Sequence, residues 1–440
     1  MLKLAAPLVL AELGWMGMGV VDTMMVGRVS AEAIGAVSLG SVLFYAVAIF
    51  GSGLMLGLDT LVSQAYGAGK LMDCHRALVS AVYFSLPLAP GLMMLVWCWV
   101  PLLGRFGIHP AVLREAVPYL KAIMWSTFPL LLYFALRRYL QGMNRATPVM
   151  FALVTANLVN LAGNWILVYG HFGARAMGAE GSGWATCISR VYMVGVLVIC
   201  MFYDAAAHRT GLLHVSLMPD FAGIRALIVL GVPAALQLTL EVGVWAAATA
   251  LIGTLDPRSL AAHQIAINTA SFTYMVPLGI SSAAAVRVGQ ALGRGDSAAA
   301  ARAGWTAMAL GAAFMTMVGV VLLAAPQYVA RAFSTNRAVI RTAVGLLAVA
   351  AAFQLFDGIQ TVATGALRGA GDTRTPMFCH LLAYWLIGLP LGYVLCFNAG
   401  WRAMGLWTGL CVALILIGSV LLFVWIRKVQ MMSHPGLAAG

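Results

Sequence analysis

Residues 7–28 are PLVLAELGWMGMGVVDTMMVGR, a nearly continuous apolar run that contains two acids, Glu12 and Asp22. Residues 233–254, PAALQLTLEVGVWAAATALIGT, form a second run of the same kind around Glu241. About 20 apolar residues are enough for a helix to cross a bilayer. Both stretches therefore predict transmembrane helices. The first contains acids and lacks a small-residue cleavage site, which indicates a retained helix and not a signal peptide.

The whole chain has this character, with 440 residues of which 62% are apolar and 9% charged. A soluble domain carries roughly 25% charged residues, so the composition excludes a soluble globular enzyme. The net charge of +12 comes from basic residues scattered in loops, which indicates a lipid bilayer and not nucleic acid as the partner. The seven cysteines form no CxxC pair, and no disulfide framework or metal site is predicted from them.

The hydropathy pattern predicts an all-α membrane protein with twelve transmembrane helices. Alternating strands are absent from the pattern, and a backbone that faces lipid must form its hydrogen bonds within its own segment. The expected spans are 4–26, 35–66, 77–103, 116–136, 148–169, 183–203, 222–252, 260–286, 303–325, 342–366, 376–397 and 402–426.

The two halves of the chain resemble each other. Residues 4–69 align without a gap with residues 230–295, and the matches include Pro7 with Pro233 and Gln64 with Gln290. Six spans in each repeat give both halves the same orientation. We therefore expect two parallel, pseudo-symmetric six-helix lobes around a central cleft, which is the plan of a transporter. The expected division is an N-lobe at 1–204, a cytoplasmic linker at 205–221 and a C-lobe at 222–440.

The distribution of basic residues predicts the orientation of the chain in the membrane. Loops on the side of the two termini, which carry residues such as Arg145, Arg209 and Arg294, hold more Lys and Arg than the opposite loops. Basic residues concentrate on the cytoplasmic side. We therefore expect both termini to be cytoplasmic.

Five acids lie inside the expected spans: Glu12, Asp22, Asp59, Glu241 and Asp357. Inserting a charge at the centre of a membrane helix costs about 2.5–3.5 kcal/mol, so each of these acids is expected to have a structural or functional role. Arg190 is the one basic residue that we assign to the membrane interior, because Lys121, Arg225 and Arg402 lie toward the ends of their spans and are counted with the loops. Several carboxylates would then lack a fixed partner and could hold a proton or a mobile cation. This excess predicts a carrier coupled to Na⁺ or H⁺.

Each of these polar residues also has a structural interpretation. Asp59 near the surface can bond a loop, and Glu12 can pair with a polar neighbour. Asn160 and Asn164 lie one helical turn apart and either ligate a cation or join helices, and Asn157 belongs to the same cluster. The isolated His263 and His380 are interpreted as packing residues. Pro7 and Pro233 either act as hinges or are tolerated kinks.

The stretches VVDTMMVGR, LDTLVSQAYGAG, NLVNLAGNWILVYG, VGQALGRGD and FDGIQTVATGALRGAGDTRTP resemble the multidrug and toxic compound extrusion (MATE) family, most closely its bacterial NorM-type branch. The likeness runs in order through nearly the whole chain. It implies a multidrug efflux antiporter that exports organic cations in exchange for Na⁺ or H⁺, and so a secondary active transporter and not an enzyme.

The resemblance also implies site residues. Asp22 with Asn160 and Asn164 matches the family's site in the first lobe, and Glu241 with Asp357 matches the cation site of the second, where Na⁺ is possible. Substrates would be cationic, partly aromatic drugs, and no cofactor is expected beyond the coupling ion. We expect a monomer in the bacterial inner membrane. The alternative function is a lipid-linked oligosaccharide flippase of the same superfamily, which would need a more basic cavity than the sequence predicts.

Overall fold

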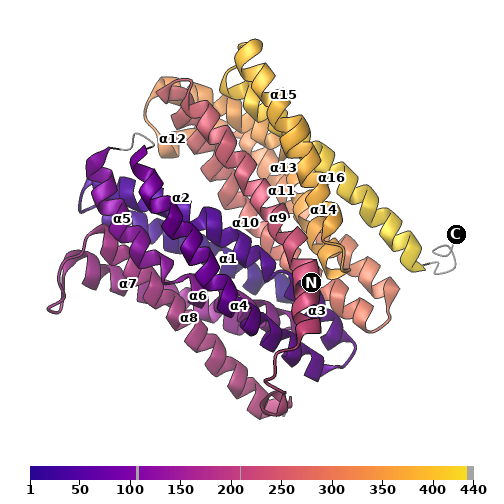
Figure 1. Ribbon diagram of the computed structural model, residues 1–440. Coiled ribbons are helices and arrows are strands. Elements are labelled where there is room, and N and C mark those ends of the chain that lie inside the picture. The colour runs from indigo at the N-terminus through magenta and orange to yellow at the C-terminus, as the bar shows by residue number, and fades with distance from the viewer. Residues whose placement is uncertain (106–108, 209, 434–440) are drawn as a thin grey trace. The chain divides into compact units, whose positions relative to one another are not determined.

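A computed structural model describes residues 1–105, 109–208 and 210–433. Within these ranges the secondary structure is helical (Figure 1). Arg209, one of the basic residues that indicate the orientation, lies outside the described residues. In the first half the helices are α1 (Leu2–Val26), α2 (Ala31–Leu54), α3 (Gly57–Gly67), α4 (Leu71–Trp99), the 3₁₀ helix η1 (Val100–Arg105), α5 (Pro110–Met124), α6 (Thr127–Gly142), α7 (Thr147–Tyr169), α8 (Ala179–His208) and the 3₁₀ helix η2 (Leu212–His214).

The second half continues in the same way. It contains α9 (Phe221–Gly253), α10 (Pro257–Gly293), α11 (Ser297–Ala324), α12 (Pro326–Phe333), α13 (Arg337–Gly369), α14 (Arg374–His380), the π-helix η3 (Leu381–Gly388), α15 (Leu389–Tyr393), the π-helix η4 (Val394–Asn398) and α16 (Ala403–Ser433).

The number of spans agrees with the sequence prediction. Among the described residues, 11 helices are long and apolar enough to cross a membrane, and a bent pair raises the number to 12. The bent pair is α5 and α6, whose axes differ by 46°. The twelve-helix, all-α architecture is therefore confirmed.

The expected end of the fourth span, at residue 136, is wrong. Helix α6 continues to Gly142, so Arg137 and Arg138 lie within it. Both arginines are buried. The hydropathy pattern ended the span early because two adjacent charges look like a loop, whereas here they pack inside the protein.

Helix ends follow local sequence signals. Ser30, Asp256 and Asp296 each accept a hydrogen bond from a backbone N–H in the first turn of the helix that follows, which satisfies a donor with no partner inside the helix. Gly69 and Gly295, which follow α3 and α10, have φ of 73° and 75°. Glycine adopts this left-handed conformation without a Cβ clash, which gives a physical reason for its presence in both repeats.

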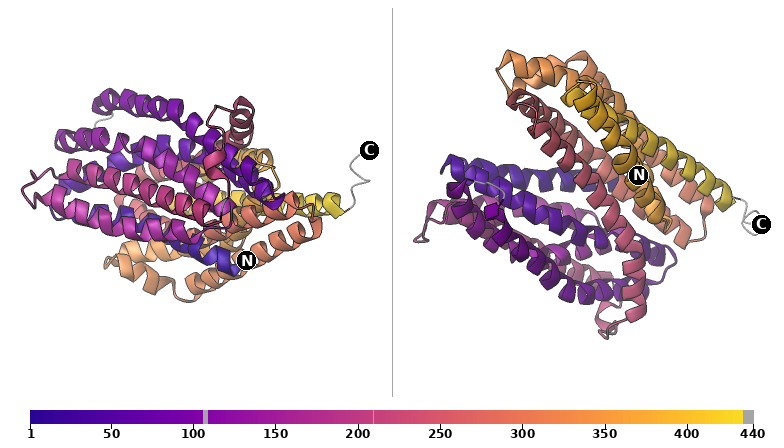
Figure 2. Two further views of the ribbon diagram at one scale, coloured as in Figure 1. Left: turned by 90° about the horizontal axis from the view of Figure 1, so that it is seen from below. Right: turned by 45° about the horizontal axis from the view of Figure 1, so that its top comes forward.

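Contacts divide the described chain into two compact units. One is Leu10–Ala235, which we call the first unit, and the other is Met1–Val9 with the chain from Leu236 onward, which we call the second unit. In the left view of Figure 2, the indigo-to-magenta helices of the first unit lie nearly parallel. Within the second unit, α13 packs against α10, α11 and α16.

Glycines allow close helix approach at two equivalent places. A Cβ on Gly53 of α2 would lie 2.5 Å from the Cα atom of Ala235 on α9. A Cβ on Gly279 of α10 would lie 2.7 Å from the Cα atom of Val9 on α1. The repeat alignment matches Gly53 with Gly279 and Val9 with Ala235. The same backbone contact is therefore built once in each unit.

Candidate functional site

In the first unit, Asp22 is the centre of a buried polar cluster. Helix α1 carries Asp22, which is 6% exposed, and α7 and α8 supply its partners. Its Oδ1 atom accepts hydrogen bonds from Asn160 Nδ2 at 3.0 Å and from Asn164 Nδ2 at 2.7 Å. Its Oδ2 atom accepts one from the Thr186 hydroxyl at 2.9 Å. The structure thus brings together the three residues expected in this half and adds Thr186.

A small cavity of about 140 Å³ adjoins this cluster. Its polar lining comes from Asp22, Thr23, Ser38, Ser41, Tyr45, Tyr119 and Thr186. The hydroxyls of Ser41 and Tyr119 are hydrogen-bonded at 2.7 Å. A carboxylate therefore faces a cavity lined by hydroxyl groups and two aromatic rings, which can bind a cation.

Arg190 is held beside this cavity by neutral partners. Its guanidinium donates to the hydroxyls of Ser126 and Tyr45 and lies 5.0 Å from the ring centre of Phe44. Burial without a carboxylate partner is costly for a charge, and the aromatic faces and hydroxyls offset part of that cost.

In the second unit, Glu241 of α9 receives hydrogen bonds from three elements. Gln237 Nε2, one turn away on the same helix, donates to Oε2 at 2.8 Å. The Tyr274 hydroxyl from α10 donates to Oε1 at 3.3 Å, and Gln360 Nε2 from α13 donates to the same atom at 3.2 Å. Glu241 is 8% exposed, so most of its solvation is supplied by these groups.

Gln360 connects the two acids that the sequence predicted for this half. Its Nε2 atom also donates to Asp357 Oδ1 at 3.1 Å. The structure therefore places Glu241 and Asp357 on either side of one amide group. The Gln360 Oε1 atom and the Tyr384 hydroxyl are buried with no hydrogen-bond partner among the described residues. Such atoms are potential ligands for a cation or a water molecule.

The acids Glu12 and Asp59 have basic partners. Arg137 donates to Glu12 in a buried ion pair, and Arg138 Nη1 lies 3.5 Å from Asp59 Oδ2. The sequence expectation that Arg190 is the one intramembrane base is therefore wrong. The error follows from the early end of the fourth span, and these two acids belong to buried ion pairs.

The asparagine cluster divides between two roles. Asn157 Nδ2 donates to the backbone carbonyl of Gly14 at 3.0 Å and so joins α7 to α1. Asn160 and Asn164, on the neighbouring turns, turn to Asp22 instead. Pro7 and Pro233 lie inside the continuous helices α1 and α9, and their role as hinges stays a prediction.

Several partners were missed by sequence reasoning. A spacing of three or four residues was a usable signal for Gln237 beside Glu241 and Gln360 beside Asp357, because residues at this spacing share a helix face. Thr186 and Tyr274 come from other helices, and no local pattern marks them. His380, interpreted from the sequence as a packing residue, also contacts Glu241, with its Nε2 atom 3.6 Å from Glu241 Oε2.

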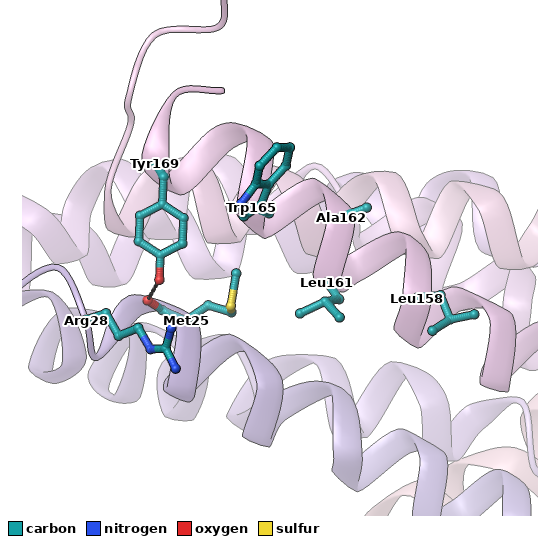
Figure 3. Close-up of a pocket in the computed structure, with 7 residues that line it drawn as sticks. All are labelled: Met25, Arg28, Leu158, Leu161, Ala162, Trp165 and Tyr169. Atoms are coloured by element: carbon teal, nitrogen blue, oxygen red, sulfur yellow. Dashed lines mark hydrogen bonds between the residues drawn. The ribbon is translucent and has the colours of Figure 1, made fainter. Parts of the chain in front are cut away.

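A larger recess of about 630 Å³ lies between α1 and α7 in the first unit (Figure 3). Its walls are mainly apolar, from Met25, Leu158, Leu161, Ala162 and Trp165, with Arg28 at one end. The Tyr169 hydroxyl donates to the Met25 carbonyl at 2.6 Å and closes that end. The recess has no acid in its lining and is separate from the Asp22 cluster.

Known proteins are similar to this chain in sequence. The family model of MatE matches residues 7–166 and 233–394. A "probable multidrug resistance protein NorM" of Mesorhizobium japonicum is 35% identical over 446 residues, covering 100% of this chain and 95% of that protein. The "multidrug resistance protein MdtK" of Yersinia pseudotuberculosis is 34% identical, over 90% of this chain and 87% of that protein.

Solved structures agree with the fold. The crystal structure of a eukaryotic MATE transporter superposes with a TM-score of 0.85, covers 98% of this chain and 97% of its own, and is 24% identical in sequence. The similarity extends over the two matched halves and nearly the whole length of the relatives. This chain therefore belongs to the MatE family.

Proposed function

We propose that this protein is a multidrug efflux antiporter that exports organic cations in exchange for Na⁺ or H⁺. Membership of the family makes it a membrane transporter and not an enzyme. The names of its relatives, NorM and MdtK multidrug resistance proteins, support the multidrug part of the proposal.

The observation that carries the antiport part is the pair of buried acids bridged by Gln360. Among the described residues, neither Glu241 nor Asp357 forms an ion pair with Lys or Arg. Two buried carboxylates that lack a Lys or Arg partner need a positive charge, either a proton or a cation. His380, whose Nε2 atom is 3.6 Å from Glu241 Oε2, is positive only when it is protonated.

Exchange follows if the coupling ion and the substrate compete for these carboxylates. A Na⁺ or H⁺ that enters from outside neutralises Glu241 and Asp357 and so weakens the binding of a cationic drug. A drug that arrives from the cytoplasm displaces the ion in turn. This reciprocity is a thermodynamic requirement for two ligands that bind mutually exclusive states. Asp22 with Asn160 and Asn164 provides a second negative site in the first unit.

The chemistry of both sites favours cationic, partly aromatic substrates. Tyr45 and Tyr119 line the cavity beside Asp22, and the Tyr274 hydroxyl bonds to Glu241. An acid supplies charge and a ring face supplies cation–π attraction of about 0.5–2 kcal/mol. We place the protein in the bacterial inner membrane, as a monomer with both termini cytoplasmic.

The test is efflux of ethidium from proteoliposomes that contain the purified protein. A Na⁺ gradient and a pH gradient are imposed separately. Efflux driven by Na⁺ alone identifies a sodium antiporter, and efflux driven by the pH gradient alone identifies a proton antiporter. Efflux that depends on neither gradient contradicts the proposal.

Single substitutions test whether Glu241 and Asp357 are needed for exchange. Asp357→Asn and Glu241→Gln should abolish gradient-driven efflux while the protein still folds and inserts. Asp73→Asn is the matched control, because Asp73 is an exposed acid that pairs with Arg76 at the surface. Normal efflux by Asp357→Asn would show that Asp357 is not part of the transport site.

The flippase alternative would need free basic groups to hold a pyrophosphate. The buried arginines among the described residues are Arg137, Arg138, Arg190 and Arg368. Arg137 and Arg138 are paired with Glu12 and Asp59. Nothing in the described residues favours the flippase, and it is not our proposal.

A further inference from the structure

The recess between α1 and α7 is an apolar groove with a cation at one end. On α7 its lining residues recur at intervals of three or four positions and so share one helix face: Leu158, Leu161, Ala162, Trp165 and Tyr169. On α1 it is lined by Met25 and Arg28. Figure 3 shows Arg28 and Tyr169 at one end and Leu158 at the other. The groove therefore follows α7 along its axis, from a polar end to an apolar one.

The groove is about as long as one leaflet of a bilayer is thick. Both α1 and α7 are long and apolar enough to cross a membrane. From Leu158 to Tyr169, the last residue of α7, a rise of 1.5 Å per residue gives about 16 Å. Half of a hydrocarbon core of about 30 Å is about 15 Å. An acyl chain of one leaflet therefore fits the groove, from the helix end to the middle of the bilayer.

The apolar side chains of the groove are exposed. Leu158 is 64% exposed, Leu161 is 44% exposed and Trp165 is 43% exposed. Trp165 and Tyr169 lie near the end of α7, and these two residue types concentrate at the interface between membrane and water. The headgroup of a lipid in the groove would then lie near Tyr169 and Arg28, with its chain toward Leu158.

Arg28 forms no ion pair with any residue that the structure describes. It is exposed, and no acid lines the recess. The exposed Arg402, by contrast, pairs with Asp256 at 3.3 Å. A guanidinium binds a phosphate through two parallel N–H donors. The charge of Arg28 therefore complements an anionic headgroup and repels an organic cation, which argues against a drug site in this recess.

A different face of α7 holds Asp22. Asn160 and Asn164 are buried and donate to its Oδ1 atom at 3.0 Å and 2.7 Å. At the polar end of the groove, the Tyr169 hydroxyl donates to the Met25 carbonyl and links the same two helices. A lipid in the groove would thus contact both α1 and α7, on a face that carries none of the candidate site residues.

We propose that the recess binds one molecule of an acidic phospholipid, with its phosphate at Arg28 and one acyl chain over Leu161 and Leu158. The occupant joins α1 to α7 from outside the transport site. The apolar groove accounts for the binding of the chain, and Arg28 accounts for the choice of an acidic headgroup. The proposal is independent of the proposed function, because it uses none of the acids of the candidate site.

Trp165 can report on the occupant of the groove. The purified full-length protein in detergent micelles is titrated with phosphatidylglycerol brominated on its acyl chain, because bromine quenches tryptophan fluorescence on contact. The signal of Trp165 is the difference between the wild type and Trp165→Phe. Phosphatidylcholine brominated at the same positions is the zwitterionic comparison. We expect half of the Trp165 signal to be lost at an about fivefold lower mole fraction of phosphatidylglycerol than of phosphatidylcholine, the effect of one basic residue near an acidic lipid.

Arg28→Gln tests the contact with the headgroup. The preference for phosphatidylglycerol should disappear, while quenching by phosphatidylcholine stays as in the wild type. Arg175→Gln is the matched control, because Arg175 is an exposed arginine in the loop after α7 and does not line the recess. Each variant is measured with and without Trp165→Phe, and thermal melting shows that it is folded. A control that loses the preference to the same extent would overturn the assignment to Arg28.

Ala162→Phe tests the contact with the chain. The larger side chain fills part of the groove and should weaken quenching by both lipids. Ala313→Phe is the matched control, because Ala313 is an exposed alanine on α11. If Arg28→Gln removes the preference and Ala162→Phe leaves binding unchanged, the site takes a phosphate group without a chain. Inorganic phosphate should then suppress the preference, and the lipid proposal would be wrong.

Two further outcomes would overturn the proposal. Equal quenching of wild-type Trp165 by the two lipids would mean that bulk lipid fills the groove without selection. Unquenched Trp165 in a protein that sediments as a dimer would assign the groove to a second copy of the chain. Absence of efflux from wild-type proteoliposomes, with the lipid preference present, would contradict the proposed function and support the lipid site.

Discussion

Individual acids in this protein differ in what neutralises them. Asp22 is surrounded by neutral donors from two asparagines and a threonine. Glu12 has the buried cation Arg137. Among the described residues Asp22 forms no ion pair with a base, although Arg190 lies beside its cavity, whereas Glu12 is paired directly. The two acids should therefore respond differently to substitution.

Asp22→Asn should abolish efflux. The substitution removes the negative charge but can keep the hydrogen bonds, because the amide oxygen can accept from Asn160 and Asn164 and the new nitrogen can donate to the Thr186 hydroxyl. Thr186→Val removes one donor to a charged group, a bond worth about 1.5–3 kcal/mol, and should weaken efflux without abolishing it. Ethidium efflux measures both. Thr155→Val on α7 is the control, because its hydroxyl bonds to its own helix; equal loss in the control would point to general damage.

Glu12→Gln should destabilise the protein strongly, because it leaves the Arg137 guanidinium buried without a counter-charge. Breaking a buried pair in this way costs about 3–5 kcal/mol. Thermal melting in detergent measures the effect. Removing both charges, with Arg137→Gln added, should restore part of the loss. The exposed Asp73–Arg76 pair is the comparison, and Asp73→Asn should cost less than about 1 kcal/mol. A double variant less stable than Glu12→Gln would argue against the pair.

At the level of helices, polar residues and glycines have separate tasks. Capping side chains such as Ser30 and Asp256 define where helices begin. Gly53 and Gly279 let two helix backbones approach more closely than any side chain would permit. The repeat keeps these glycines in both halves while the acids differ, since Asp22 aligns with Ala248 and Glu241 with Trp15. The scaffold is thus duplicated, and the polar sites are specific to each unit.

Gly53→Ala and Gly279→Ala should each lower stability. An added Cβ meets backbone atoms at 2.5 Å and 2.7 Å, and a backbone cannot move aside as a flexible side chain can. Overpacking of this kind typically costs about 1–3 kcal/mol. Gly91→Ala is the matched control, because nothing lies within 4 Å of its Cβ position. Melting temperatures of the three variants decide the matter, and a control that falls as far as the others would contradict the explanation.

For the molecule as a whole, twelve spans are an even number, which predicts that both termini lie on one side of the membrane. Each unit buries one of the two candidate sites, Asp22 in the first unit and Glu241 with Asp357 in the second, and the first unit also buries two ion pairs. The arrangement of two lobes about a cleft stays a prediction from the repeat. The side on which the termini lie stays a prediction from the basic loops.

Labelling of single cysteines tests this orientation. In a chain whose seven native cysteines are replaced, Arg175→Cys lies in an exposed loop expected outside and Arg294→Cys in an exposed loop expected inside. A membrane-impermeant maleimide should label the first in intact cells and the second only after permeabilisation. The reverse pattern would place both termini on the outside.

The sequence by itself determined the class of fold, the number of spans and which acids are buried. These properties depend on local apolar length and on the need of each backbone to bond within its own helix. Tertiary structure decided which acids are neutralised. Arg137 reaches Glu12 across 125 positions of sequence, and Gln360 reaches Glu241 across 119. Such pairings depend on which helix faces pack together, and no local pattern along the chain contains that information.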